Sequence, residues 1–107
     1  MRAFIFAGLL ALSPAALADD MVTYEITLKG AAFDIPEFKV PAGKPFIIKL
    51  TNQNAAPAEL EAKEMKIEKA VAGNSSIVVR VKALEAGKYL FVDEYQEDVA
   101  KGYVIVE

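Results

Sequence analysis

Alternation of apolar and polar residues along the chain predicts a series of short strands. Residues 22–29 alternate without interruption, and residues 45–51 and 76–83 repeat the pattern. A period of two residues is typical of a strand that buries one face and exposes the other. The apolar positions that share a face on these segments are Val22, Tyr24, Ile26, Leu28, Phe46, Ile48, Leu50, Ile77, Val79 and Val81.

Turn residues and less regular segments separate these strands. Residues 41–44 (Pro-Ala-Gly-Lys) and 73–75 (Gly-Asn-Ser) have turn composition. Pro36 interrupts the extended segment 33–40, which favours an edge or bent strand. Residues 59–69 fit either a short helix or an irregular strand, and we expect them to be mostly extended. Two further strands are expected at 89–92 and 102–106. The chain then has about seven short strands and no convincing helix, so we expect an all-β sandwich or small barrel.

The first eighteen residues have the composition of a secretory signal peptide. A basic residue precedes an apolar run over 3–12, and Ala16-Leu17-Ala18 fits a small-x-small cleavage site. The run is shorter than the roughly 20 residues that a membrane-spanning helix needs. We therefore predict a cleaved leader over 1–18, a single domain over 19–107 and export to the periplasm. An uncleaved membrane anchor is the alternative.

Composition excludes several classes of function. The chain has no histidine and no cysteine, so the usual nucleophile–base pairs of hydrolases are missing and we expect no enzymatic activity of that kind. A metal-assisted, ferroxidase-like role stays open. The formal net charge of −3 argues against nucleic acid as a partner, because nucleic-acid binding needs a basic surface.

Several motifs resemble those of a known family. They are Glu37-Phe38-Lys39-Val40-Pro41-Ala42-Gly43-Lys44-Pro45, Glu59-Leu60-Glu61 after Asn52 and a Pro/Ala loop, and Glu94-Tyr95-Gln96-Glu97-Asp98 before Gly102. Together they are similar to cupredoxin-like domains, above all to the small periplasmic proteins encoded with bacterial high-affinity ferrous-iron permeases. The resemblance implies a Greek-key β-sandwich. It also implies a membrane iron permease or a periplasmic iron-binding protein as the partner.

The ligands of a blue-copper member are not present in this chain. Such a member would place cysteine near Asp93, histidine near Glu59 and Gln96, and methionine near Ala100 or Lys101. Because the chain contains neither thiolate nor imidazole, a type 1 copper site is chemically unavailable.

Carboxylates are the remaining candidate ligands. If the fold brings the loop at 52–61 beside the loop at 93–102, oxygen atoms from both could bind one cation; iron or manganese is the first choice, with calcium or magnesium also compatible. The candidate ligands are Glu59, Glu61, Glu94, Asp93 and the Gln96 carbonyl. Glu68 is a further candidate ligand or ion-pair partner, and Asp93 could instead cap the turn after its strand.

Two other interpretations of the acidic loops, besides metal binding, remain open. Acidic residues in loops are most often solvated surface. The protein could also be a metal-free adaptor that docks onto a membrane transporter or another periplasmic partner through these loops. We expect a monomer or a weak dimer.

Overall fold

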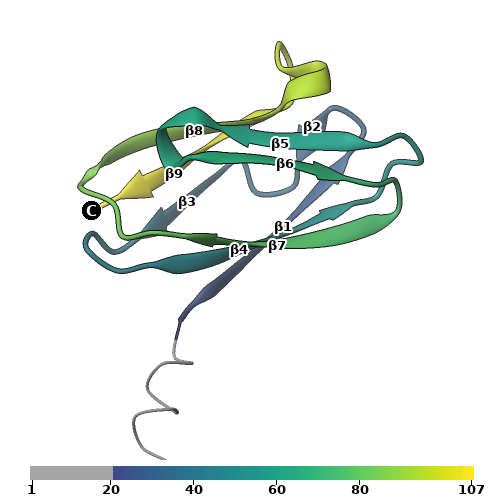
Figure 1. Ribbon diagram of the computed structural model, residues 1–107. Coiled ribbons are helices and arrows are strands. Elements are labelled where there is room, and N and C mark those ends of the chain that lie inside the picture. The colour runs from purple at the N-terminus through teal and green to yellow at the C-terminus, as the bar shows by residue number, and fades with distance from the viewer. Residues whose placement is uncertain (1–20) are drawn as a thin grey trace, which may run out of the picture.

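The computed structural model describes residues 21–107 as two β-sheets packed face to face (Figure 1). One sheet has the order β2-β1-β4-β7, and the other has the order β3-β9-β8-β5-β6. The strands are β1 (Thr23–Lys29), β2 (Ala32–Phe33), β3 (Glu37–Val40), β4 (Phe46–Asn52), β5 (Ala58–Ala62), β6 (Ile67–Val71), β7 (Ser75–Val81), β8 (Gly87–Asp93) and β9 (Lys101–Val106). No helix of this part of the chain is both long enough and apolar enough to cross a membrane. The predicted leader at 1–18 lies outside the described residues.

The expected all-β sandwich is confirmed, and the structure refines the number of strands. Nine strands form within residues 21–107 because two segments are each divided. Segment 33–40 contributes to β2 and β3, which belong to different sheets. Segment 59–69 forms β5, the short 3-10 helix η1 (Lys63–Met65) and β6. Lys66 ends η1 with a φ of 59°, and this left-handed residue turns the chain back so that β5 and β6 pair as antiparallel neighbours.

Alternation along the strands builds the core between the two sheets. In β4, Phe46, Ile48 and Leu50 are buried while the residues between them are half-buried, as the period predicts. Val22 was expected to face inward but is 55% exposed. It precedes β1, which begins at Thr23, although its carbonyl accepts a hydrogen bond from Ile47 N–H at 3.0 Å. Met65, the last residue of η1, is 5% exposed and packs in the core.

Aromatic rings connect the sheets at the centre of the core. The Phe33 and Phe91 rings meet edge to face with their centroids 5.0 Å apart, and Tyr24 stacks on Phe38 at 5.0 Å. Edge-to-face and offset stacked pairs are the favourable aromatic geometries. These contacts join β2 to β8 and β1 to β3, so they hold the two layers together.

The turn between β6 and β7 packs tightly against the loop between β4 and β5. Asn74 N–H donates to the Asn54 carbonyl at 2.9 Å, and a Cβ added to Gly73 would overlap the Ala55 carbonyl. We expect Gly73→Ala to lower the free energy of unfolding by about 1–3 kcal/mol, the usual cost of overpacking. Urea denaturation measures this. Gly87→Ala is the matched control, since its Cβ would make an ordinary 3.4 Å contact with Tyr89; equal effects of the two changes would refute the steric argument.

Candidate metal centre

Three carboxylates from three elements converge on the outer face of the five-stranded sheet. They belong to Glu59 in β5, Glu68 in β6 and Glu94 in the 3-10 helix η2 (Glu94–Gln96), and one oxygen from each lies within 4.8 Å of the others. Glu59 and Glu94 are half-buried, whereas Glu68 is exposed. The spacing is short enough for one cation to contact oxygens of all three residues.

Strand geometry explains why these side chains meet. Glu59 lies between the buried Ala58 and Leu60, so the pleat of β5 turns its side chain outward. In the β5–β6 register Glu59 is opposite Ala70 and Glu61 is opposite Glu68, which makes Glu59 and Glu68 diagonal neighbours. Long side chains can meet across such a diagonal.

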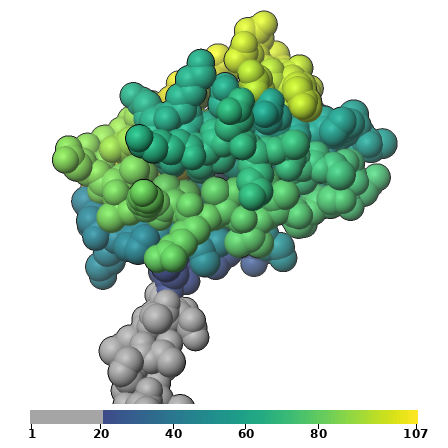
Figure 2. Space-filling model, viewed as in Figure 1, coloured from purple at the N-terminus to yellow at the C-terminus, as the bar shows by residue number. Residues whose placement is uncertain are grey.

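The third carboxylate comes from the segment that follows β8. Leu60 of β5 is the register partner of Asp93, the last residue of β8. The chain then turns into η2, which brings Glu94 beside β5. In the space-filling view, the segment around η2, coloured yellow, protrudes from the surface formed by β5 and β6 (Figure 2).

The Glu59 carboxyl perturbs the titration of the neighbouring Glu94 carboxyl. The pKa of Glu94 is raised, first because its carboxyl shares a hydrogen bond with the Glu59 carboxyl, then because of desolvation, and also because of the negative charge of Glu59. The positive charge of Lys63 acts in the opposite direction. Like charges brought together disfavour ionisation unless a proton or a cation compensates them.

This shift predicts a pH-dependent effect of removing the Glu94 charge. A raised folded-state pKa contributes stability below the ordinary glutamate pKa of about 4.3, and this contribution is lost as the pH rises through the folded-state value. We therefore expect Glu94→Gln to melt at a higher temperature than the wild type at pH 7, and at nearly the same temperature at about pH 3.5. Thermal melts by circular dichroism in chelator at low salt test this. The account fails if the difference is the same at both pH values.

The other sequence-predicted ligands lie apart from this group. Glu61 is on the same face of β5 but lines a neighbouring pocket with Lys63 and Glu64. Asp93 points toward the interior and is 2% exposed. Gln96, at the end of η2, uses its side-chain amide in hydrogen bonds within the protein. The structure thus brings the carboxylates of Glu59 and Glu94 together, and the third carboxylate beside them belongs to Glu68.

The Asp93 carboxylate accepts hydrogen bonds from three donors within the protein. Its Oδ1 accepts from the backbone N–H of Glu59 at 3.0 Å and of Tyr95 at 3.2 Å. Its Oδ2 accepts from Gln96 Nε2 at 2.9 Å. The bond from Tyr95 makes Asp93 the N-cap of η2, the capping role that its position after a strand had suggested.

Comparison with known proteins agrees with the topology. The cupredoxin-like domain family matches residues 2–106. The chain belongs to this family. An uncharacterised protein of Rickettsia prowazekii (strain Madrid E) is 27% identical to this cupredoxin-like chain over 88 residues, which cover 82% of the chain and 70% of the relative.

Solved structures share the fold at low sequence identity. Auracyanin A, a "blue" copper protein from Chloroflexus aurantiacus, superposes with a TM-score of 0.71 at 21% identity, over 82% of this chain and all of the other. The metal-binding domain of the Cu(I)-exporting P-type ATPase CopA of Streptococcus pneumoniae D39, solved with Cu(I), gives 0.73 at 16% identity, over 83% and 89% of the two chains. At these identities the likeness establishes the fold alone.

The residues of this chain do not fit the copper site that such neighbours suggest. A type 1 site needs a thiolate and two imidazoles, and the chain has neither group. The described part of the chain instead offers carboxylates on the outer face of the sheet, where Glu59, Glu68 and Glu94 present only hard oxygen donors.

Proposed function

We propose that this cupredoxin-like protein binds one hard cation through Glu59, Glu68 and Glu94, and that it serves iron or manganese handling in the periplasm. The observation that carries the proposal is the convergence of three carboxylate oxygens within 4.8 Å from three separate elements. Anionic oxygen ligands suit manganese, magnesium, calcium and iron rather than Cu(I) or zinc.

The electrostatics of the group favour an occupied state. The pKa of Glu94 is raised by its hydrogen bond with Glu59, by desolvation and by the negative charge of Glu59, and a bound cation would compensate the negative charges brought together here. Three protein ligands leave coordination positions for water or for ligands from a partner. Because Glu68 is exposed and the other two carboxylates are only half-buried, a cation could enter and leave without unfolding. These properties suit a protein that passes a cation on.

The biological setting follows from the sequence resemblance. The motifs at 37–45 and 94–98 are similar to those of accessory proteins of ferrous-iron permeases, and the first eighteen residues resemble an export signal. In this setting the protein would carry iron to a membrane permease, or receive it from a periplasmic protein, without catalysing a reaction through its own side chains.

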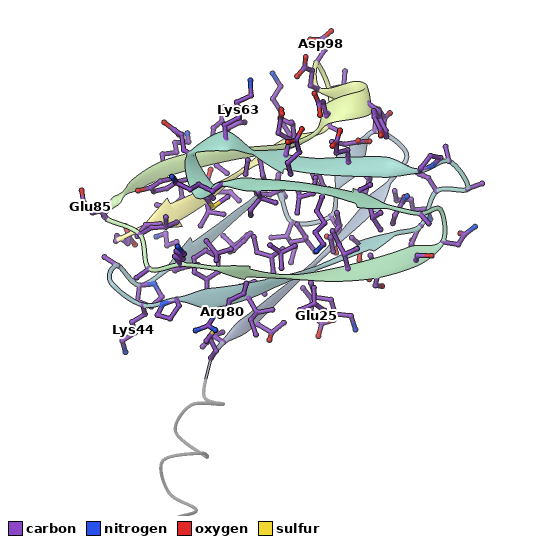
Figure 3. All side chains as sticks on the ribbon, in the orientation of Figure 1. Glu25, Lys44, Lys63, Arg80, Glu85 and Asp98 are labelled. Carbon is purple, nitrogen blue, oxygen red and sulfur yellow. The ribbon has the colours of Figure 1, made fainter. Side chains whose placement is uncertain are left out.

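A metal-free adaptor is the second candidate, and the surface of η2 and of the loop that follows it favours this role. Tyr95 and Val99 are 60% and 61% exposed, and they lie beside the acidic Glu97 and Asp98. Asp98 points away from the body of the protein (Figure 3). Exposed apolar side chains surrounded by acidic ones are suited to a partner that has an apolar centre and basic residues around it.

Native mass spectrometry of residues 19–107 with ferrous, ferric, manganous and cupric ions tests the first candidate. We expect a one-to-one adduct with ferrous and manganous ions that survives at low micromolar protein. Bare protein with every ion would contradict cation binding and favour the adaptor. The double change Glu97→Lys/Asp98→Lys separates the two candidates, because it should leave the cation adduct intact if the three glutamates bind it.

A further inference from the structure

The buried carboxylate of Asp93 connects the two segments that carry Glu59 and Glu94. Asp93 and Asn52 are the two buried polar residues of the described chain, and Asp93 lies at the junction of β8 and η2. Its Oδ1 accepts from Glu59 N–H and from Tyr95 N–H. One oxygen atom therefore fixes the backbone at Glu59 and the backbone immediately after Glu94.

Gln96 holds this carboxylate in place from the other side. Its Nε2 donates to Asp93 Oδ2 at 2.9 Å and to the Gly30 carbonyl at 3.2 Å. Gly30 also exchanges two hydrogen bonds with the Asn54 side chain, at 2.7 and 2.9 Å. The network thus links the β1–β2 turn, the β4–β5 loop, the start of β5 and η2.

Backbone hydrogen bonds also connect Asp93 and Gln96 to Ala100, at the end of the same loop. Asp93 N–H donates to the Ala100 carbonyl at 3.0 Å, and Ala100 N–H donates to the Gln96 carbonyl at 2.9 Å. The positions joined are Glu59, Asp93, Gln96 and Ala100, where a copper-binding member of the family would place its ligands. In this chain hydrogen bonds connect these four positions.

We propose that Asp93 is a positioning residue: its carboxylate, oriented by Gln96, sets the separation between Glu59 and Glu94 and does not bind the cation itself. The cation part of this inference rests on the proposed function, whereas the hydrogen-bond part does not. The Asp93 carboxylate is 2% exposed and already accepts hydrogen bonds from three protein donors. A cation that displaced any of these donors would leave it buried and unpaired, which is costly.

Two substitutions of Asp93 separate positioning from ligation. Asp93→Asn keeps an oxygen that can accept from Glu59 and Tyr95, and a rotated Gln96 amide can accept from the new Nδ2 through its Oε1. Asp93→Ala removes both side-chain oxygens. In a positioning role, Asp93→Ala lowers Mn²⁺ affinity about 10- to 100-fold, as is usual when a residue that orients ligands is lost. Asp93→Asn then stays within about threefold of the wild type, because the backbone contacts remain. If Asp93→Asn loses as much affinity as Asp93→Ala, Asp93 is a ligand and the proposal is overturned.

Amide hydrogen exchange gives a readout that needs no metal. In Asp93→Ala the Glu59 and Tyr95 amides should exchange about tenfold faster, since each loses a hydrogen bond, while Asp93→Asn should retain their protection. Unchanged exchange in Asp93→Ala overturns the proposal. If that variant does not fold, Gln96→Ala replaces it: loss of the bond to Oδ2 should accelerate both amides, and no change overturns the proposal. A wild type that binds no Mn²⁺ but shows the expected exchange pattern would refute the proposed function alone.

Discussion

Asn52→Asp is expected to destabilise the protein by about 3–5 kcal/mol at pH 7, the cost of an uncompensated buried charge. Asn52 is 0% exposed. Its Nδ2 donates to the carbonyls of Ala56 and Ala72 at 2.9 and 3.3 Å, and its Oδ1 accepts from Asn54 N–H at 3.0 Å. Aspartate would place a carboxylate oxygen against two carbonyl oxygens.

The pH dependence of this effect follows from the same contacts. Burial and the facing carbonyls would raise the folded-state pKa of the new aspartate, so its penalty should grow as the pH rises above the ordinary value of about 3.9. Below that pH the protonated side chain can donate a hydrogen bond to one carbonyl, and the decrease in the free energy of unfolding should become smaller. Urea denaturation at pH 7 and at about pH 3.5 measures both values.

Gln53→Glu is the matched control, because it adds the same charge at the adjacent exposed position. We expect it to change the free energy of unfolding by no more than about 0.5 kcal/mol, as is usual at the surface. If Asn52→Asp costs no more than this control, the contacts with the Ala56 and Ala72 carbonyls do not stabilise the β4–β5 and β6–β7 connections.

The double change Glu59→Gln/Glu94→Gln is expected to lower Mn²⁺ affinity by about 100-fold or more. Loss of a residue that merely orients a metal ligand already lowers metal affinity about 10- to 100-fold. In this variant two of the three charged ligands themselves become neutral amides. Glu68 alone would remain as a carboxylate. Isothermal titration with Mn²⁺ measures the effect, and the fold should persist because both side chains lie on the outer face of the sheet.

Glu97→Gln/Asp98→Asn controls for net charge. It removes the same two negative charges from the loop that follows η2, outside the group of three carboxylates. We expect its Mn²⁺ affinity to stay within about threefold of the wild type, since Glu97 and Asp98 are exposed, lie outside the group, and interact with a bound cation only through a charge that salt screens. Equal losses in the two double variants would mean that the cation responds to the overall acidity of the protein and not to a defined site.

The strands and the core could be predicted from the sequence because their signal is local. Alternation of apolar and polar positions placed Phe46, Ile48 and Leu50 inside, and the structure confirms all three. Val22 fits the same alternation yet is exposed, because the pattern alone does not show that the strand begins at Thr23. The segment 59–69 was ambiguous since a 3-10 turn, ended by a left-handed Lys66, interrupts its period.

The grouping of the carboxylates depended on contacts that the sequence does not show. Glu68 joins Glu59 only through the β5–β6 register, and that register is set by the turn at η1. The role of Asp93 depends on a hydrogen bond to a residue 34 positions away. Residue type predicted carboxylate ligands in the two loops, but register and burial decide which carboxylates meet and which one is enclosed.

Paramagnetic broadening by Mn²⁺ in an amide ¹H–¹⁵N NMR spectrum tests the cation site most directly. With a small fraction of an equivalent of Mn²⁺, we predict that the amide signals of Glu59, Glu68 and Glu94 and their neighbours broaden first, while those of β7 on the opposite sheet remain sharp. Uniform weak broadening, broadening centred on Asp98, or none at all would contradict a cation site at these three glutamates.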